Sequence, residues 1–148
     1  MIQRIQTLFL LLAVLFLTVQ AFTPMILSTA PEPQGVFQDG RLFVSEYTVS
    51  LALLSASILA SFLTIWLFKK RKLQKNLVIL SIVLIIACNV AGFFYFFPSG
   101  QLATNTVQAG LKPGIGALFP LLGLILLVLA YRFIDKDEKT VKSMDRLR

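Results

Sequence analysis

Long uncharged stretches alternate with short charged ones along the chain of 148 residues. No Asp, Glu, Lys or Arg occurs in four stretches, residues 5–30, 47–68, 76–111 and 113–131. A bilayer core about 30 Å thick is crossed by roughly 20 apolar residues in an α-helix. The pattern therefore predicts an integral membrane protein with spans at about residues 5–27, 47–68, 77–97 and 113–131, followed by a tail over residues 132–148.

Composition supports one all-α membrane domain over residues 1–148. Of the residues, 57% are hydrophobic and 14% are charged, whereas soluble domains contain about 25% charged residues. The segments between the spans are too short to hold a separate soluble domain of ordinary size. We therefore expect a bundle of four transmembrane helices with short connections.

The basic residues are distributed unevenly between the two sides of the predicted bundle. Arg4, the loop between the second and third spans, and the tail carry twelve of the fourteen basic residues, and only Arg41 and Lys112 fall on the other side. Short loops rich in Lys and Arg stay in the cytoplasm. The distribution predicts that both termini are cytoplasmic, as an even number of spans requires, and it explains the net charge of +7 without nucleic acid as a partner.

The first span has two interpretations. Arg4, the apolar residues 8–17 and the small residues around Ala21 could form a cleavable signal peptide. Apolar residues continue through Phe22, Met25, Ile26 and Leu27, however, which favours a retained span. Cleavage would leave the other three spans in the same orientation.

The loop after the first span predicts a small β-hairpin cap outside the membrane. Asp39-Gly40 lies between β-prone residues, and this dipeptide favours a type I′ turn, in which both central residues have positive φ. Residues 104–107 of the second outer loop could add a strand. The apolar side chains of Phe37, Leu42 and Phe43 are expected to pack on the outer surface of the protein itself.

Small and polar residues within the spans have a packing interpretation and a transport interpretation. Ala52, Ala56 and Ala60 recur every four residues beside Ser57 and Ser61, a spacing that allows close helix contact in lipid. Alternatively, the hydroxyl groups of this span could line a polar path. The residues that we assign to helix packing are Asn89, Ser57, Ala56, Gly92 and Pro120.

Two of these packing residues carry further expectations. The amide of Asn89 is expected to bond across a helix interface. Pro113 is expected in the first turn of the fourth span, and Pro120, further in, should kink that helix.

The chain lacks the residues from which catalytic or metal sites are usually built. It has no His, and Cys88 is its one cysteine, so it offers neither a disulfide nor metal-ligand spacing. The predicted spans contain no ionisable residue that could act as an acid, a base or an ion relay. We expect no enzyme activity, no cofactor and no metal.

The loop between the second and third spans predicts contact with anionic lipid headgroups. It is entirely basic, and a tryptophan precedes it at the depth where aromatic belts occur. The candidate headgroup-contact residues are Lys69, Lys70, Arg71, Lys72, Lys75 and Trp66.

The tail predicts a charged helix that continues the fourth span into the cytoplasm. Asp135–Lys139 and Glu138–Lys142 are acid-before-base pairs at i,i+4 spacing, the favourable orientation. The tail could dock a protein partner or lie on anionic headgroups. The candidate docking residues are Arg132, Asp135, Lys136, Asp137, Glu138, Lys142, Asp145, Arg146 and Arg148.

The two ends of the chain are similar to a known family. The opening residues 1–13, MIQRIQTLFLLLA, and the closing residues 130–148, AYRFIDKDEKTVKSMDRLR, resemble the domain of unknown function 4293 family, small four-span membrane proteins of Bacteroidota. The resemblance implies a bacterial inner-membrane protein with a retained first span, and it implies no activity.

These observations lead to a hypothesis and a rival from another class. The hypothesis is a non-enzymatic accessory subunit of an inner-membrane complex, docked through the tail; translocon, secretion and respiratory assemblies are all open as hosts. The rival is a small transporter or channel for an uncharged or lipid-like solute, based on Asn89, the serines of the second span and Pro120.

Overall fold

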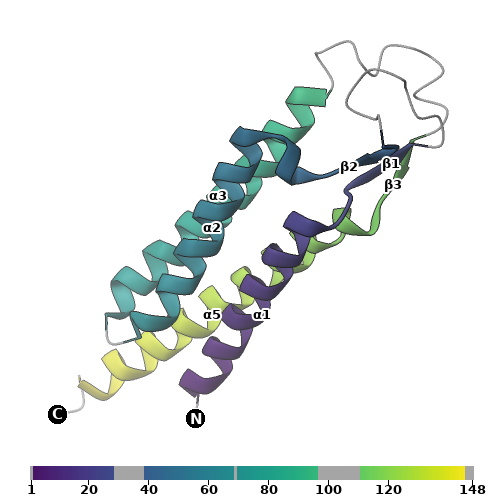
Figure 1. Ribbon diagram of the computed structural model, residues 1–148. Coiled ribbons are helices and arrows are strands. Elements are labelled where there is room, and N and C mark those ends of the chain that lie inside the picture. Colours follow the sequence, from purple (N-terminus) through teal and green to yellow (C-terminus); the bar gives the residue numbers. More distant parts are fainter. Residues whose placement is uncertain (1, 29–38, 69, 97–110, 146–148) are drawn as a thin grey trace.

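Four long helices form the molecule. The computed structural model describes residues 2–28, 39–68, 70–96 and 111–145. The helices are α1 (Ile2–Phe22), α2 (Thr48–Trp66), α3 (Arg71–Phe96) and α5 (Phe119–Asp145), and each is long and apolar enough to cross a bilayer. They run side by side, with both termini at one end of the bundle (Figure 1). The protein is therefore a multi-pass membrane protein, as the sequence predicts.

The bundle consists of two helix pairs, α1 with α5 and α2 with α3 (Figure 1). The buried positions on each helix recur at alternating steps of three and four residues, the spacing of a helix-packing seam. On α1 they are Gln6, Leu10, Ala13, Leu17 and Gln20, and on α5 they are Pro120, Gly123, Leu127, Ala130 and Ile134. The opposite faces expose large apolar side chains such as Leu15, Leu59 and Leu121, which suits contact with lipid chains.

A glycine lets α1 and α5 approach each other closely. A Cβ atom built on Gly123 would lie 2.8 Å from Cδ2 of Leu17, closer than carbon atoms pack. Leu17 is fully buried, so it fills the space that the missing side chain leaves. Small residues serve the same purpose wherever membrane helices pack tightly.

Two of the predicted helix boundaries are wrong, and proline explains the first. The first span was expected to reach residue 27, but α1 ends at Phe22 and Ile26–Ser28 forms strand β1. Pro24 has no backbone N–H to continue the helix, and it restricts the residue before it. The fourth helix begins at Phe119 and not at Pro113, so Pro120 lies in its first turn. Proline is tolerated in the first turn of a helix, so Pro120 gives no reason for the kink that was predicted in this helix.

A small sheet joins three helix ends at the end of the bundle opposite the termini. Strand β1 lies between β2 (Arg41–Leu42) and β3 (Leu111–Pro113), and both pairings are antiparallel. The short 3₁₀ helices η1 (Val44–Glu46) and η2 (Ile115–Ala117) connect β2 to α2 and β3 to α5. The sheet therefore ties α1 to the starts of α2 and α5, so that both helix pairs are held together here.

The sheet differs from the predicted hairpin. Residues Arg41 and Leu42 are extended, but their strand pairs with Ile26 and Leu27. Among the described residues only Gly40 has positive φ, so Asp39 does not adopt the type I′ conformation. Leu42 is buried and Phe43 is half-buried. Phe37, the rest of residues 29–38 and the possible strand at residues 104–107 lie outside the described residues.

The packed face of α2 includes its serines Ser57 and Ser61 but only one alanine of the predicted pattern, Ala60. Ser57 is fully buried, and its hydroxyl donates to the carbonyl oxygen of Ser81 on α3 at 3.0 Å. Ala52 is exposed and Ala56 is half-buried. The hydroxyl group of Ser57 therefore joins α2 to α3, whereas that of Thr64 bonds within α2, to the carbonyl oxygen of Ala60.

Asn89 does not make the expected bond between helices. Its amide donates to the carbonyl oxygen of Ile85, one turn earlier in the same helix, at 2.7 Å. Its side chain is half-buried. Gly92 lies one turn further on, and a Cβ there would be 3.9 Å from Oγ of Ser50, an ordinary contact between α3 and α2.

Two glutamines on α1 are expected to respond in opposite directions to the same substitution. Gln20 is fully buried, and neither polar atom of its amide has a hydrogen-bond partner among the described residues. Gln20→Leu should raise the stability of the protein by up to about 1 kcal/mol, because an unpartnered buried amide is costly. Gln6 donates to the carbonyl oxygen of Phe133 at 3.1 Å, so Gln6→Leu should lower stability by about 1 kcal/mol. Unfolding of both variants in detergent measures this; the same sign for both would contradict the assignment.

Candidate functional site at the charged end of the bundle

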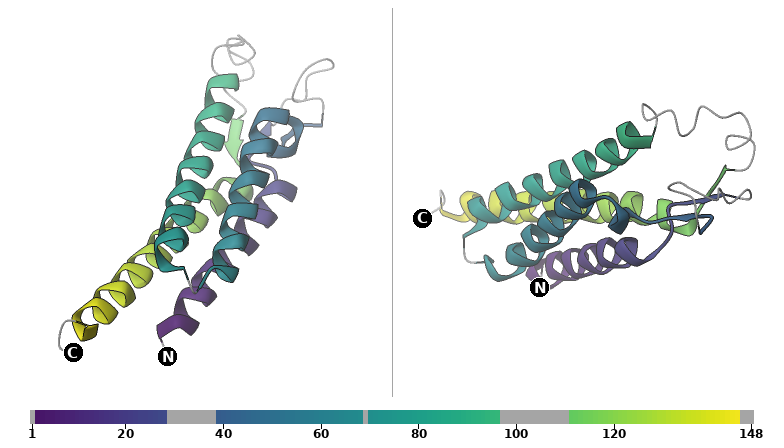
Figure 2. Two further views of the ribbon diagram at one scale, coloured as in Figure 1. Left: turned by 90° about the vertical axis from the view of Figure 1, so that its left-hand side faces the viewer. Right: turned by 45° about the horizontal axis from the view of Figure 1, so that its top comes forward.

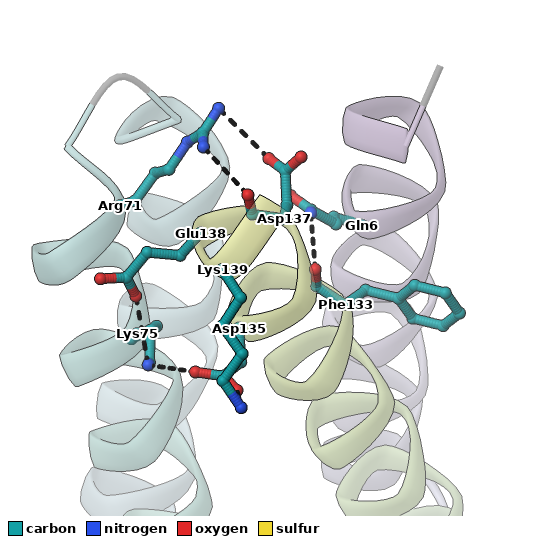
Figure 3. A network of polar contacts seen from close by, with 8 residues as sticks. All are labelled: Gln6, Arg71, Lys75, Phe133, Asp135, Asp137, Glu138 and Lys139. Atoms are coloured by element: carbon teal, nitrogen blue, oxygen red, sulfur yellow. Dashed lines mark hydrogen bonds and ion pairs between the residues drawn. The ribbon is translucent and has the colours of Figure 1, made fainter. Parts of the chain in front are cut away.

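The charged residues of α3 and α5 meet where both termini lie, which we call the charged end. The predicted helical continuation of the fourth span is confirmed, because α5 runs without interruption from Phe119 to Asp145. Its residues 135–139 lie beside the first turns of α3, and α1 flanks it on the other side (Figure 3). The first turns of the tail therefore belong to the bundle.

Lys75 on α3 holds two carboxylates of α5. Its Nζ atom lies 2.5 Å from Oδ1 of Asp135 and 3.2 Å from Oε2 of Glu138. It also lies 5.5 Å from the centre of the Tyr131 ring. The three charged side chains are only 20–27% exposed, so these pairs are screened less than surface pairs are. Lys75 therefore fixes α3 to α5 at this level.

A second ion pair lies beyond Lys75, toward the end of the helices. Nη2 of Arg71 is 3.3 Å from Oδ2 of Asp137, and Nη1 donates to the carbonyl oxygen of the same residue at 3.3 Å (Figure 3). Both distances are longer than the 2.7–2.9 Å or so of a strong charge-assisted bond. The guanidinium group therefore keeps donor capacity for another acceptor.

Helix α1 is joined to α5 at the same level. Besides the bond from Gln6 to Phe133, the rings of Phe9 and Phe133 stack with their centres 5.4 Å apart. Residues 133–138 of α5 are thus held from both sides, by α1 and by α3. A chain cut after Arg132 would lose these contacts.

The charges of the tail are sorted between two faces. Asp135, Asp137 and Glu138 face the bundle, as their contacts show, whereas Arg132 and Lys136 are exposed. Lys139 contacts Asp135 at 2.9 Å, the predicted i,i+4 pair, and its side chain remains 77% exposed. Glu138 contacts Lys75. The predicted pair of Glu138 with Lys142 involves a side chain, that of Lys142, which lies outside the described part. The face turned away from the bundle is therefore basic.

The last turns of α5 extend past the connection between α2 and α3 (Figure 2). Thr140 and Ser143 are exposed, and their hydroxyl groups bond to the carbonyl oxygens of Lys136 and Thr140 within the same helix. Contacts of these two side chains with another helix are absent from the described part of the chain. This segment is available to a partner.

The predicted headgroup-contact residues fall into two groups. Lys70, Lys72 and Trp66 are exposed, as such contact requires. Arg71 and Lys75 are turned toward α5 and are used in ion pairs. Lys69 lies outside the described residues, as do Arg146 and Arg148 of the tail, and the side chain of Asp145 is also not described.

Sequence reasoning missed the pairing between α3 and α5. It treated the basic loop as lipid-facing and the acids of the tail as partner-facing. A signal was available, because an entirely basic segment and a cluster of three acids, Asp135, Asp137 and Glu138, flank spans at the same end of the predicted bundle. Gln74 is buried at the same end. Its burial could not be predicted, because it lies in a charged segment without a periodic pattern of apolar residues.

The described residues contain no group of three or more His, Cys, Asp or Glu side chains that could hold a metal ion.

Comparison with known proteins gives one match. No curated protein and no solved structure matches the chain. A family model described as Domain of unknown function (DUF4293) matches residues 2–147, which covers all four helices and the described tail. The chain is therefore a member of the DUF4293 family.

Proposed function

We propose that the protein is a non-enzymatic accessory subunit of a bacterial inner-membrane complex, with both termini in the cytoplasm. The distribution of basic residues supports this orientation, since twelve of fourteen lie at the charged end or in segments connected to it. The packing of α1 supports a retained first span, because Leu10, Ala13 and Leu17 are fully buried. Removing α1 would expose the opposing face of α5.

We further propose that the docking surface is the projecting part of α5, from Thr140 onward, together with the basic face that leads to it. The observation that supports this surface is the separation of acidic and basic side chains onto two faces of the tail. The acids Asp135, Asp137 and Glu138 are used inside the bundle, while Arg132, Lys136 and most of Lys139 remain exposed. A partner with an acidic surface complements this face.

The transporter alternative receives less support. Its proposed polar path depended on the serines of α2, and Ser57 and Ser61 are fully buried against the rest of the bundle. Asn89 bonds within its own helix, and Pro120 does not interrupt α5. The three features that motivated a path therefore have packing explanations.

Site-specific photo-crosslinking in native membranes tests the docking proposal. A photoreactive residue at Ser143 should give a discrete protein adduct, because this position is exposed on the projecting helix. The control position is Leu121, which is 60% exposed on the lipid-facing part of α5 and should give lipid adducts only. Lipid adducts alone at both positions would contradict docking through this segment.

A further inference from the structure

The charged end encloses a cavity that the proposed docking does not use. Its volume is about 220 Å³, and all four segments of the bundle contribute to its wall, including Gln6 from α1, Ile65 from α2, Arg71 and Gln74 from α3, and Asp137 from α5. Typical small-molecule pockets measure about 300–1,000 Å³. This cavity therefore suits a headgroup-sized ligand.

Gln74 gives the cavity an unused polar group. The residue is 4% exposed, and it lines the cavity. Its backbone N–H donates to Lys70, and its side-chain amide makes no hydrogen bond with the described residues. Its amide atoms are not among the fully buried unpartnered atoms of the described residues, so they are accessible, and a ligand in the cavity can bond to them.

The charges on the wall define the chemistry of that ligand. Arg71 and Asp137 both line the cavity, so it presents one cation and one anion and is neutral as a whole. Each contact between them is long, at 3.3 Å. A ligand with its own anion and cation could bond to both groups without leaving either charge unpaired. A purely anionic ligand would instead be repelled by the carboxylate of Asp137 and would have no cation of its own to pair with it.

We propose that the cavity binds the zwitterionic headgroup of a phospholipid with a primary ammonium, such as phosphatidylethanolamine. The phosphate oxygens accept from Arg71 and from the amide of Gln74. The ammonium donates to the carboxylate of Asp137 and to the side-chain oxygen of Gln6, whose N–H already donates to Phe133. Choline cannot replace ethanolamine here, because a quaternary ammonium has no N–H to donate.

The position of the cavity indicates that the ligand comes from the membrane. It lies at the end of the apolar helices and is lined by Ile65, which precedes Trp66 in the sequence. Trp66 is 73% exposed, and such aromatic residues sit at headgroup depth. Ile65 and Ile134 form an apolar part of the wall, suited to the glycerol end of the lipid. None of the residues named in this proposal belongs to the projecting docking segment, so the two proposals fail separately.

Native mass spectrometry of the delipidated full-length protein tests this proposal. The protein is mixed with equal amounts of phosphatidylethanolamine, phosphatidylcholine and phosphatidylglycerol. Wild type should retain about tenfold more of the ethanolamine lipid than of either other lipid, the difference expected from one good bond to a charged group. Equal retention of all three lipids would overturn the proposal.

Three variants separate binding from folding. Gln74→Leu should lower the retention of all three lipids, because it removes a donor to the phosphate that they share, yet the variant should unfold, when free of lipid, at or above the wild-type temperature, because the lipid-free bundle loses no bond of this amide. Asp137→Asn makes the cavity positive and should move the preference to phosphatidylglycerol. Lys136→Gln, on the outward face, should behave as wild type. Retention of the ethanolamine lipid at the wild-type level by Gln74→Leu, or an unchanged preference in Asp137→Asn, would refute the site.

A water-soluble competitor distinguishes the two sources of the headgroup. Glycerophosphoethanolamine has the same zwitterion but no acyl chains, and it should displace the lipid only at large excess. Displacement at equal concentration would overturn the membrane as the source of the ligand, although the cavity would still bind the zwitterion.

Discussion

Replacing Gly116 by alanine is expected to destabilise the protein by about 3 kcal/mol, the upper part of the usual range for overpacking. Gly116 is buried in η2, and its N–H donates to the carbonyl oxygen of Pro24 at 3.0 Å. A Cβ atom here would lie 2.6 Å from that oxygen and 2.7 Å from the carbonyl oxygen of Thr23. These are backbone atoms, so no rotamer change can relieve the clash. The measurement is unfolding in detergent micelles, followed by circular dichroism.

Gly92→Ala is the matched control for this prediction. Its Cβ would lie 3.9 Å from Oγ of Ser50, an ordinary contact, and alanine is the better helix former by about 1 kcal/mol. Gly92→Ala should therefore be neutral or stabilising. If Gly116→Ala were equally neutral, the close approach between η2 and the segment after α1 would be refuted.

Charge reversal at Lys75 is expected to have the second largest effect. Lys75→Glu would place three carboxylates together, where the structure now has two around one ammonium group. The side chain of Lys75 is 21% exposed, so the loss should be about 1–2 kcal/mol, between the values for surface and buried pairs. We expect it as earlier thermal unfolding, with a difference from wild type that shrinks at high salt.

Two further variants check the cause of this loss. Combining Lys75→Glu with Glu138→Lys restores an opposite charge to position 75 and should recover part of the stability, which a double-mutant cycle quantifies. Lys72→Glu makes the same charge change at an exposed position of the same helix and should unfold near wild type. If the Lys72 variant were as unstable as the Lys75 variant, net charge would be responsible and the specific pairs would not.

The sequence predicts the four helices well, because long uncharged runs leave a chain few alternatives in a bilayer. It also predicts the helical tail, since the i,i+4 pair Asp135–Lys139 forms as expected. Helix ends are predicted less well, because apolar residues such as Ile26 and Leu27 suit a strand as readily as a span. Here Pro24 decides between the two, through its missing N–H.

The candidate site is predicted only in part. A run such as 135–139 shows which charges are present, but it does not show which of them face a neighbouring helix. That depends on the register of α3 against α5, which brings Lys75 level with Asp135 and Glu138. The packed face of α2 is a similar case: Ala52, Ala56 and Ala60 fit the small-residue pattern, whereas the buried bond comes from Ser57. Both sets of small residues on α2 could have formed the contact, and only the packing of the helices shows which residues do.

The most direct test of this account compares two truncations of the N-terminally tagged protein, purified from native membranes in mild detergent. The central claim is that residues up to Lys139 stabilise the bundle and that residues 140–148 dock a partner. Truncation after Lys139 should keep the thermal stability of the full chain and lose a stoichiometric partner protein. Truncation after Arg132 should lose both, because the contacts of Phe133, Asp135, Asp137 and Glu138 disappear. Recovery of the same partner with the chain that ends at Lys139, or of no partner with the full chain, would contradict the claim.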